Sequence, residues 1–454
     1  MARRLGTIVA AALTAAGALA VPAGARAASD PPAITGAVNP SLTPFGTHGL
    51  LLVAEKAAPL NHANTELVAR VSLQGGAHRI WRTTKRLGRV DRQLDSAQVA
   101  VNARGVGAVM WSKSVGDDAR TQVRLRRHDG SWSKVYQVPR SSFTGVDSGG
   151  VAVNSRGEVV VLSTTRMGRS VLAVHRPGHG WHVVTLPHNL YFPSQVGLDA
   201  RGGIHVAETT QPRGGNGHVI VSYRSPGGTW SGHRVKTGGM VETGQLLVAP
   251  DGSETLVVGR ASRTWVSTLD TEAYWPTQYD VFARHGAHRH WQKVWHRMGA
   301  SQLSAVALNH RVRLTWTQYA DPNSHRAPQT IKLQTRSLRT GAPVTTLASQ
   351  ATEVSGRTWE PDFATATAIG ARGCDVQAWR ADAVGTYGGI LTSVAGNRRA
   401  TYPDARVARA DVQAAPACVA NGHGFLARTA NERVVTEDDG QYLIGGDIVV
   451  VVTN

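Results

Sequence analysis

Aromatic and acidic side chains gather in one long segment of the sequence, between residues 261 and 280. The candidate ligand-binding residues in it are Trp265, Asp270, Glu272, Tyr274, Trp275, Tyr279 and Asp280. Flat aromatic rings stack on the C–H faces of sugar rings, and carboxylates accept hydrogen bonds from sugar hydroxyls. The pattern predicts a carbohydrate-binding loop. The alternative is that the rings only anchor a long loop to the rest of the protein.

Four histidines follow this segment, at positions 285, 288, 290 and 296. His288 and His290 are two residues apart, so on a strand they would share one face, as a pair of metal ligands can. No cysteine or carboxylate completes such a set within the hairpin, and we predict an exposed polar turn and no metal site. The glycine-rich stretch 214–217 precedes a strand and not a helix, which excludes a phosphate-binding loop. We expect no cofactor.

The chain is basic, with 49 Lys and Arg against 31 Asp and Glu and a formal net charge of +18. The basic residues are spread along the chain without a block of five or six like charges. Such an excess favours anionic surroundings, such as an acidic cell-wall polymer or an acidic sugar. The simpler interpretation is a solvated basic surface. No nucleic-acid-binding module is recognisable, so nucleic acid is not an expected partner.

Residues 1–27 are predicted to be a secretory signal peptide. Arg3 and Arg4 precede an apolar run over residues 5–21, and Ala25-Arg26-Ala27 supplies small residues before the cleavage site. A membrane anchor is the alternative, but the run is short for a span of about 20 residues. Cleavage leaves residues 28–454 with 46 basic and 31 acidic residues, a net charge of +15. We expect a secreted protein without a transmembrane segment after signal removal.

A hairpin pattern recurs along the rest of the chain, with an apolar run, a tight turn containing Asn or Asp and Gly, and a second apolar run. Seven copies stand out, at residues 99–111, 151–162, 196–207, 246–258, 306–316, 363–379 and 412–426. Their period is about 53 residues. A period of this size indicates a repeat architecture.

A tryptophan follows a second turn downstream of most hairpins. These residues are Trp132, Trp181, Trp230 and Trp291, with Trp81 as an earlier relative. Each repeat is therefore interpreted as four short strands, the last of which carries the tryptophan. Four-stranded repeats of this length are typical of β-propellers, because a single blade cannot bury both of its faces. We expect Trp132, Trp181 and Trp230 to be at least partly buried between adjacent blades.

The predicted fold class is all-β, a single β-propeller of four-stranded blades over residues 28–454. Second strands are counted eight times, at residues 50–54, 106–111, 158–162, 203–207, 254–258, 311–316, 375–379 and 424–427. This count predicts eight blades, and seven is the alternative because the repeats fade at both ends. The final unit, 412–454, lacks an outer strand, whereas residues 33–38 form a spare extended segment. We expect the N- and C-terminal strands to pair and close the ring.

The two cysteines, Cys374 and Cys418, are 44 residues apart, which is nearly one repeat. This separation places them on inner strands of neighbouring blades. In an exported protein an even number of cysteines favours pairing, so we predict a disulfide bond between blades seven and eight. Two buried free thiols are the alternative.

The loops differ between the two ends of the predicted blades. Turns between first and second strands are short, whereas loops between second and third strands vary and include the long segment 261–280. Function usually lies on the elaborated face of such a scaffold. The variable-loop face is therefore the predicted functional face.

The segments Asp-Gly-Ser-Trp132 and Gly-Gly-Thr-Trp230 resemble the Asp-box hairpins, Ser-x-Asp-x-Gly-x-Thr-Trp, of secreted sialidase-type (BNR-repeat) propellers. The Gly-x-Thr-Trp end of the motif is present as Gly227, Gly228, Thr229 and Trp230, but Ser225 stands in place of its Asp and Tyr223 in place of its Ser. In that family these hairpins are structural, so the resemblance implies a fold and transfers no catalytic residue. With 42 Arg and seven Lys, a bias typical of GC-rich genomes, the number of arginines says nothing about a sialidase-type carboxylate site.

These observations favour a secreted, non-enzymatic binding or scaffold protein that acts on extracellular glycan or an anionic cell-wall polymer through its variable-loop face. A sialidase-like glycoside hydrolase and a protein-interaction propeller are the alternatives. The hydrolase would need two carboxyl groups roughly 5 to 10 Å apart, or Tyr with Glu beside an arginine cluster. The interaction propeller would expose an apolar patch.

Overall fold

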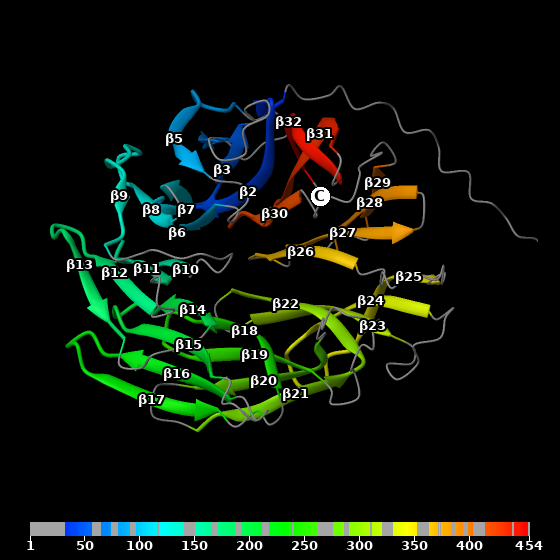
Figure 1. Ribbon diagram of the computed structural model, residues 1–454. Helices are drawn as coiled ribbons and strands as arrows, with labels where there is room; N and C mark the ends of the chain where they lie inside the picture. Colours follow the sequence, from blue (N-terminus) through cyan, green and yellow to red (C-terminus); the bar gives the residue numbers. More distant parts are fainter. Residues whose placement is uncertain are drawn as a thin grey trace, which may run out of the picture.

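The computed structural model describes most of the chain after residue 31 (Figure 1). The described ranges are 32–56, 65–73, 80–90, 97–115, 118–139, 150–164, 170–186, 192–210, 218–235, 237, 240–261, 276–285, 290–308, 311–319, 330–351, 363–370, 372, 374–383, 386–393, 398–402, 414–437 and 440–452. Every element within these ranges is a β-strand. The predicted all-β class is confirmed, whereas the predicted signal peptide, 1–27, lies outside these ranges.

The described strands form eight four-stranded antiparallel sheets, numbered here along the chain. Sheet 1 contains β2 (Ala37–Phe45), β3 (Gly49–Lys56), β4 (Thr65–Ser72) and β5 (Lys85–Val90). Sheet 2 contains β6 (Gln98–Val101), β7 (Gly107–Val115), β8 (Asp118–Arg126) and β9 (Tyr136–Gln137). Sheet 3 contains β10 (Gly150–Val153), β11 (Val159–Thr164), β12 (Ser170–His175) and β13 (Trp181–Thr185). Sheet 4 contains β14 (Phe192–Leu198), β15 (Ile204–Thr210), β16 (His218–Arg224) and β17 (Trp230–Val235).

The remaining four sheets follow the same order of strands, except the last. Sheet 5 contains β18 (Met240–Val248), β19 (Glu254–Ala261), β20 (Pro276–Arg284) and β21 (Gln292–Met298). Sheet 6 contains β22 (Ala300–Leu308), β23 (Arg311–Tyr319), β24 (Thr330–Ser337) and β25 (Thr345–Ala351). Sheet 7 contains β26 (Phe363–Ile369), β27 (Asp375–Ala383), β28 (Thr386–Ser393) and β29 (Arg398–Tyr402). Sheet 8 contains β30 (Ala414–Cys418), β31 (Gly424–Glu437), β32 (Gly440–Val452) and β1 (Ile34–Thr35).

Burial differs sharply between inner and outer strands. The second strands β3 and β11 are almost continuous apolar runs, and their side chains are buried on both faces. A strand covered on both faces loses the apolar–polar alternation of a half-exposed strand. The outer strand β21 is mostly exposed. The eight apolar runs that the sequence assigns to second strands begin within one residue of β3, β7, β11, β15, β19, β23, β27 and β31.

Successive sheets pack face to face around a common centre (Figure 1). The first strand of each sheet contacts the first strand of the next, from β2 through β6, β10, β14, β18, β22 and β26 to β30, and β30 contacts β2. Clusters of buried apolar residues lie between sheets. One of them contains Leu50 and Leu52 of sheet 1 together with Phe425 and Ile448 of sheet 8. The chain therefore has a propeller-type fold.

The two ends of the described chain meet in sheet 8. Strand β1 pairs antiparallel with β32, with Ile34 opposite Ile448 and Thr35 opposite Asp447. The backbone N–H of Ala33 also donates to the carbonyl oxygen of Ile448, at 2.7 Å. The outermost position of this sheet is thus occupied by N-terminal residues.

The repeated tryptophans pack between neighbouring sheets, as predicted. Trp132, at the start of the outer part of sheet 2, packs against the cluster shared by sheets 1 and 2. Trp181 and Trp230 occupy the equivalent places one and two sheets later. All three are half-buried. Each tryptophan therefore seals the outer edge of one inter-sheet core.

The predicted disulfide bond joins Cys374 and Cys418, whose Cα atoms are 6.0 Å apart. Cys418 ends β30, an inner strand, whereas Cys374 lies in the turn just before β27 and not on an inner strand. A Cβ atom added at Gly370 would lie 2.3 Å from the Cβ atom of Cys418. The bond between sheets 7 and 8 thus requires glycine at position 370.

Reduction of this disulfide is expected to lower the free energy of unfolding by about 2–4 kcal/mol, because the cross-link restricts the unfolded chain. Denaturant unfolding of the oxidised and reduced protein measures the difference. Thiol labelling of the denatured, unreduced protein should detect no free cysteine, and the Cys374→Ser/Cys418→Ser variant should unfold like the reduced parent. Two labelled thiols, or equal midpoints with and without reductant, would contradict the prediction.

Within the described ranges, no helix has the length and apolar character needed to cross a membrane.

Candidate functional site

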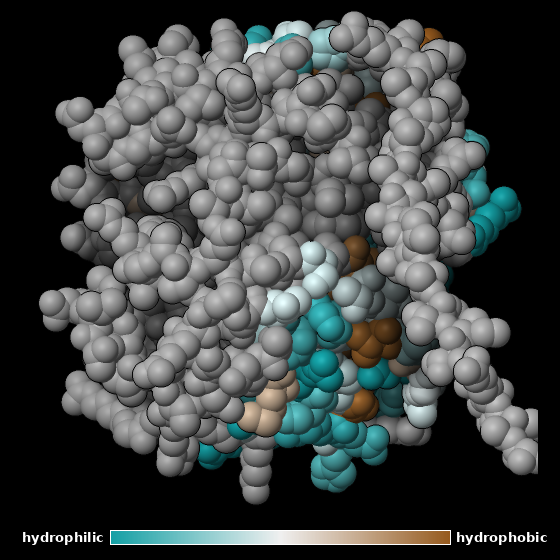
Figure 2. Space-filling view, turned by 90° about the vertical axis from the view of Figure 1, so that its right-hand side faces the viewer, coloured by the Kyte–Doolittle hydropathy of each residue, from teal (hydrophilic) through white to brown (hydrophobic). Residues whose placement is uncertain are grey.

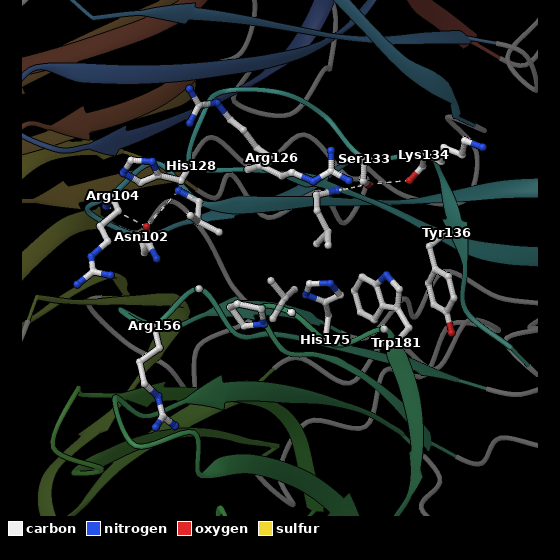
Figure 3. Close-up of a pocket in the computed structure, with 18 of the residues that line it drawn as sticks. Asn102, Arg104, Arg126, His128, Ser133, Lys134, Tyr136, Arg156, His175 and Trp181 are labelled. Atoms are coloured by element: carbon white, nitrogen blue, oxygen red, sulfur yellow. Dashed lines mark hydrogen bonds between the residues drawn. The ribbon is translucent and has the colours of Figure 1, made fainter.

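A basic groove of about 810 Å³ lies between sheets 2 and 3. It is lined by Asn102, Arg104, Val106, Leu125, Arg126, Arg127, His128, Ser133, Lys134, Val135, Tyr136, Arg156, Gly157, Val159, His175, Pro177, Gly178, Gly180 and Trp181. Figure 3 shows Arg104, Arg156 and His128 at one end, and Trp181, Tyr136 and Lys134 at the other. We refer to this set of residues as the basic groove.

The groove exists because the outer strand of sheet 2 is very short. Strand β9 contains two residues and pairs only with Gln122 and Val123 of β8. Residues 133–135 connect the isolated bridge at Trp132 to β9 without pairing as a strand. In sheet 3 the corresponding strand, β13, has five residues. The shortened edge leaves the space between the two sheets open to solvent.

The lining of the groove contains five cationic side chains and no carboxylate. Arg104, Arg127 and Lys134 are exposed and form no ion pair with the described residues. Arg156 is paired with Glu158, at 2.9 Å, just outside the lining. A cluster of like charges that outnumbers the neighbouring anions attracts an anionic ligand, and arginine can bind a carboxylate or phosphate with two parallel hydrogen bonds.

Arg126 is the one buried cation of the lining, with 7% of its surface exposed. Its guanidinium donates a hydrogen bond to the carbonyl oxygen of Gly105 and lies 4.8 Å from the centre of the Phe45 ring. Burial lowers the pKa of Arg126, the charge of Arg82 lowers it further, and Asp129 partly opposes both. Arg126 therefore fixes the floor of the groove, while the exposed cations remain available to a ligand.

The other end of the groove is closed by stacked aromatic rings. The rings of Tyr136 and Trp181 are parallel, with centroids 4.6 Å apart, and His175 lies against Trp181 at 5.2 Å. Burial lowers the pKa of His175, and the positive charge of Arg127 lowers it further. Because the rings stack on one another and on the inter-sheet core, they form the wall at this end of the groove.

The groove opens at the end of the sheets opposite to the predicted functional face. Its lining comes from the tight turns between first and second strands and between third and fourth strands. Consecutive antiparallel strands reverse direction, so these turns lie at one end of each sheet and the variable loops lie at the other. The sequences of these short, regular turns do not predict a groove, because the groove arises from the shortness of strand β9 and not from the turns.

The predicted aromatic loop falls largely outside the described residues. Trp265, Asp270, Glu272, Tyr274 and Trp275 lie in the range 262–275, so their role in ligand binding stays a prediction.

Tyr279 and Asp280 lie on β20, which begins at Pro276, and not in a loop that ends at Asp280. This corrects the predicted loop boundary. Tyr279 is 3% exposed and packs in the core with Trp316.

Asp280 is fully buried and belongs to a structural ion-pair cluster. Its carboxylate lies 2.6 Å from Arg260, 3.0 Å from Lys293 and 2.8 Å from His296. Burial raises the pKa of Asp280, but hydrogen bonds from His296 and Lys293 and the charges of Arg260 and Lys293 outweigh burial and lower it. The carboxylate is therefore already occupied by three partners from its own sheet.

The histidine-rich hairpin contains no described metal site. His285 and His290 are exposed, His296 pairs with Asp280, and position 288 lies outside the described ranges. Among the side chains that the structure places, no group of three or more His, Cys, Asp or Glu is arranged to hold a metal ion.

The side of the molecule shown in Figure 2 is mainly hydrophilic where residues are described. Its hydrophobic residues form small, separate patches. The described part of this side therefore presents no continuous apolar surface of the kind that a protein partner would cover.

Neither protein-family models nor curated sequences match this chain. Solved structures do match it. The β-propeller domain of the trilobed protease from Pyrococcus furiosus has a TM-score of 0.46 and 9% identity over 82% of this chain and 99% of that chain. The α-L-arabinanase from Penicillium chrysogenum has a TM-score of 0.37 and 13% identity, over 68% of this chain and 96% of that one. A Hadza microbial sialidase has a TM-score of 0.35 and 13% identity, over 69% of this chain and 66% of that one.

These similarities are all at low identity and concern the propeller-type fold. The activities of the matched proteins do not transfer to this chain, because one fold carries many functions.

Proposed function

We propose that the protein is a secreted, non-enzymatic binding protein for an anionic extracellular polymer, which it holds in the basic groove. The observation that carries the proposal is the composition of the lining, five cationic side chains and no carboxylate. Three of these cations, Arg104, Arg127 and Lys134, are exposed and without an ion-pair partner among the described residues. The ligand class matches the basic balance of the whole chain.

Binding without hydrolysis is the function that this lining supports. Glycoside hydrolysis usually needs a pair of carboxyl groups on the two sides of the scissile bond. Two acids described beside the groove are already engaged. Glu158 lies 2.9 Å from Arg156 and 3.5 Å from Arg176, and Asp129 accepts a hydrogen bond from the backbone N–H of Ser131 at 2.8 Å. An anion in the groove would meet donors and positive charge, but no carboxyl group of the lining.

The proposed scaffold is an eight-bladed ring, closed by the pairing of β1 with β32. Three observations support the proposal. The described strands form eight four-stranded sheets, the first strand of sheet 8 contacts the first strand of sheet 1, and these two sheets share a buried apolar cluster.

The hairpins that end in Trp132 and Trp230 are proposed to be degenerate Asp-box-like elements with a structural role. The turn before Trp230 joins β16 to β17, and the hydroxyl of Ser225 accepts a hydrogen bond from the backbone N–H of Thr229, at 3.1 Å. Ser225 thus serves the turn in the place where the motif has its Asp. Packing of both tryptophans against inter-sheet cores supports the same role.

Export is supported by the disulfide bond, because disulfides form and persist mainly in oxidising compartments. Residues 28–454 would then act outside the cell, with their excess positive charge facing extracellular anionic polymers.

Charge reversal in the groove tests the proposal. The Arg127→Glu/Lys134→Glu variant changes two exposed residues and should fold normally. We expect it to bind polygalacturonate at least about tenfold more weakly than the parent, because two charge-assisted contacts become repulsive. Isothermal titration calorimetry at moderate salt measures the difference, with dextran as the uncharged probe.

The matched control is Lys332→Glu/Arg339→Glu, which makes the same change of net charge at two exposed positions in sheet 6. This control should bind polygalacturonate nearly as well as the parent. Equal losses in both double variants would show that net charge alone drives binding. A parent protein that binds neither polygalacturonate nor heparin would also overturn the proposal.

A further inference from the structure

Three consecutive turns at the groove end of the sheets share the sequence pattern Asn or Asp, any residue, Arg, Gly. They are residues 102–105, 154–157 and 199–202, which join the first and second strands of sheets 2, 3 and 4. The pattern recurs at the same structural position, so each arginine occupies an equivalent place in its sheet. The three are Arg104, Arg156 and Arg201.

The first residue of each turn fixes the backbone. Asn102 Oδ1 accepts hydrogen bonds from the N–H groups of Arg104 and Val106, at 2.9 and 3.1 Å. Asn154 and Asp199 make the same pair of contacts in their own turns. The glycine that ends each turn has a φ between 78° and 88°, which favours glycine over other residues. The arginine before it is exposed at the tip in all three turns.

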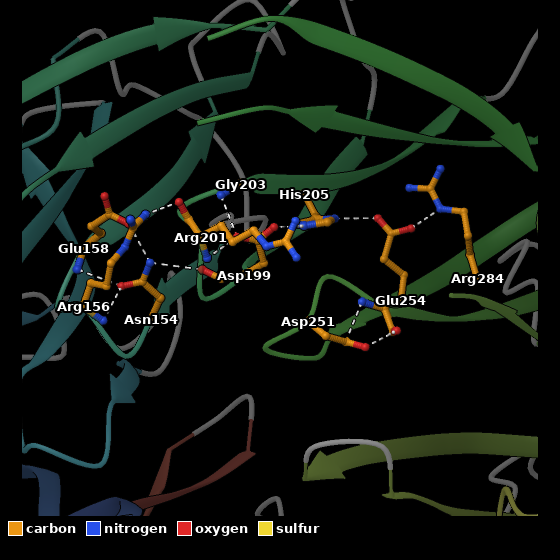
Figure 4. A network of polar contacts seen from close by, with 11 residues as sticks. Asn154, Arg156, Glu158, Asp199, Arg201, Gly203, His205, Asp251, Glu254 and Arg284 are labelled. Atoms are coloured by element: carbon orange, nitrogen blue, oxygen red, sulfur yellow. Dashed lines mark hydrogen bonds and ion pairs between the residues drawn. The ribbon is translucent and has the colours of Figure 1, made fainter. Parts of the chain in front are cut away.

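Hydrogen bonds also connect each turn to the next. Asn102 Nδ2 donates to the carbonyl oxygen of Asn154, at 2.8 Å, and Asn154 Nδ2 donates to that of Asp199, at 3.1 Å. The guanidinium of Arg156 donates to the carbonyl oxygen of Arg201 (Figure 4). Since these bonds join side chains of one turn to the backbone of the next, the spacing of the three turns that carry the arginines is fixed before any ligand binds.

The three arginines of these turns form a row of positive charges with few ion-pair partners among the described residues. Arg104 and Arg201 form no ion pair with the described residues, and Arg156 shares Glu158 with Arg176. Holding three like charges at fixed spacing costs free energy through repulsion, which a bound polyanion would remove.

The row ends at sheet 5. There the equivalent turn is Pro250-Asp251-Gly252, with an acid and no arginine. The favourable track for an anion therefore covers sheets 2 to 4, which is one sheet more than the groove.

We propose that Arg104, Arg156 and Arg201 form an extended track for one linear, polyanionic polysaccharide, which enters the basic groove and continues across the turn of sheet 4. This inference rests on the proposed function, because the groove supplies two of the three sheets. Nucleic acid is disfavoured as the ligand because single strands bind through stacking of bases on free aromatic rings, whereas Tyr136 and Trp181 stack on each other.

A variant at Arg201 tests the track independently of the groove, because Arg201 belongs to the track but does not line the groove. For Arg201→Gln we expect unchanged binding of short oligogalacturonates that fill only the groove. Long polygalacturonate should bind about three- to tenfold more weakly. By counterion-release reasoning, the negative slope of log K against log salt concentration should become shallower by about one for the long polymer. Fluorescence titration at several salt concentrations measures all three.

The Arg339→Gln variant, at an exposed position in the turn between β24 and β25 of sheet 6, is the control and should behave like the parent for both lengths. Arg201→Lys should keep the salt slope, because it keeps the charge. Unchanged affinity and slope for the long polymer in Arg201→Gln would overturn the track while the groove stands. Equal weakening of short and long ligands would overturn it as well, because the change would then act through the turn.

Two further results of these titrations would refute more than the track alone. Absence of binding of both ligands to the parent would refute the groove and the track together. Tighter binding of single-stranded DNA than of polygalacturonate, with the same dependence on Arg201, would refute the polysaccharide assignment.

Discussion

Replacement of Glu254 by glutamine is expected to lower the free energy of unfolding by about 3–5 kcal/mol near pH 6, because it breaks a buried ion-pair network. Glu254 is 2% exposed and joins sheets 4 and 5. One carboxylate oxygen lies 2.7 Å from Nδ1 of His205, and the other accepts a hydrogen bond from Arg284 (Figure 4). Glutamine keeps the shape but leaves the charges of His205 and Arg284 less compensated.

The geometry around His205 indicates an imidazolium ion. Its two ring nitrogens face carboxylate oxygens, Nδ1 toward Glu254 and Nε2 toward Asp199 at 3.4 Å. A neutral imidazole could donate to only one of these acceptors. Burial by itself lowers the pKa of His205, but the hydrogen bonds and charges of Asp199 and Glu254 outweigh burial and raise it.

The same network predicts how stability depends on pH. Because the pKa of His205 is raised on folding, its protonated form stabilises the protein fully below the unfolded pKa of about 6.5. That stabilisation is lost as pH rises through the raised folded pKa. Burial raises the pKa of Glu254, but His205 and Arg284 lower it overall. Its contribution is therefore present above the unfolded pKa of about 4.3 and lost as pH falls through the lowered value.

Denaturant unfolding from about pH 2 to pH 9 measures both effects, because the Glu254 contribution is lost only below its unfolded pKa. The control is Glu66→Gln, which removes one partner of the surface pair with Arg86 and should cost no more than about 1 kcal/mol. In His205→Gln, the loss of stability on the alkaline side should disappear. If Glu254→Gln and Glu66→Gln unfold at the same denaturant concentration near pH 6, the buried network does not stabilise the fold.

The sheets could be located from sequence because every repeat has to satisfy the same physical constraints, so the same residue pattern recurs along the chain. A second strand covered on both faces must be apolar, and a tight turn before it needs Asn or Asp and Gly, as at 102–105 and 154–157. Because several copies of the hairpin pattern agree, the assignment of strands does not depend on any single copy. The disulfide between Cys374 and Cys418 was predictable for the same reason, since a separation of one repeat places residues on neighbouring sheets.

The groove could not be located in this way, because it depends on what one repeat lacks. Strand β9 has two residues, and nothing in the segment Ser133 to Val135 marks it as too irregular to pair. The arginines of the turns carried a usable signal, since Arg104, Arg156 and Arg201 recur in register. That signal was hidden among 42 arginines, and it becomes informative only once the turns are known to lie side by side.

The buried ring of Trp111 is expected to be the most sensitive single site of the apolar core. Trp111 ends the apolar part of β7, is 1% exposed, and packs with Leu67 and Leu87 in the cluster between sheets 1 and 2. Its ring lies directly on Gly88, where an added Cβ atom would be 2.5 Å from Cζ2. Trp111→Ala should therefore cost about 3–5 kcal/mol, because the cavity that it leaves is walled by strands of two sheets and collapses little.

The companion variant is Trp132→Ala, which removes the same side chain from the same cluster at a half-buried position. It should cost clearly less than Trp111→Ala, because solvent already reaches part of the ring and can fill the space. Gly88→Ala should destabilise the protein through overlap with Trp111, and Trp111→Phe should relieve part of that overlap, so the two changes should not be additive. Chemical denaturation of the four variants measures these differences. If Trp132→Ala costs as much as Trp111→Ala, or if Gly88→Ala and Trp111→Phe add independently, then the ring of Trp111 is not packed on Gly88 in the closed core between sheets 1 and 2.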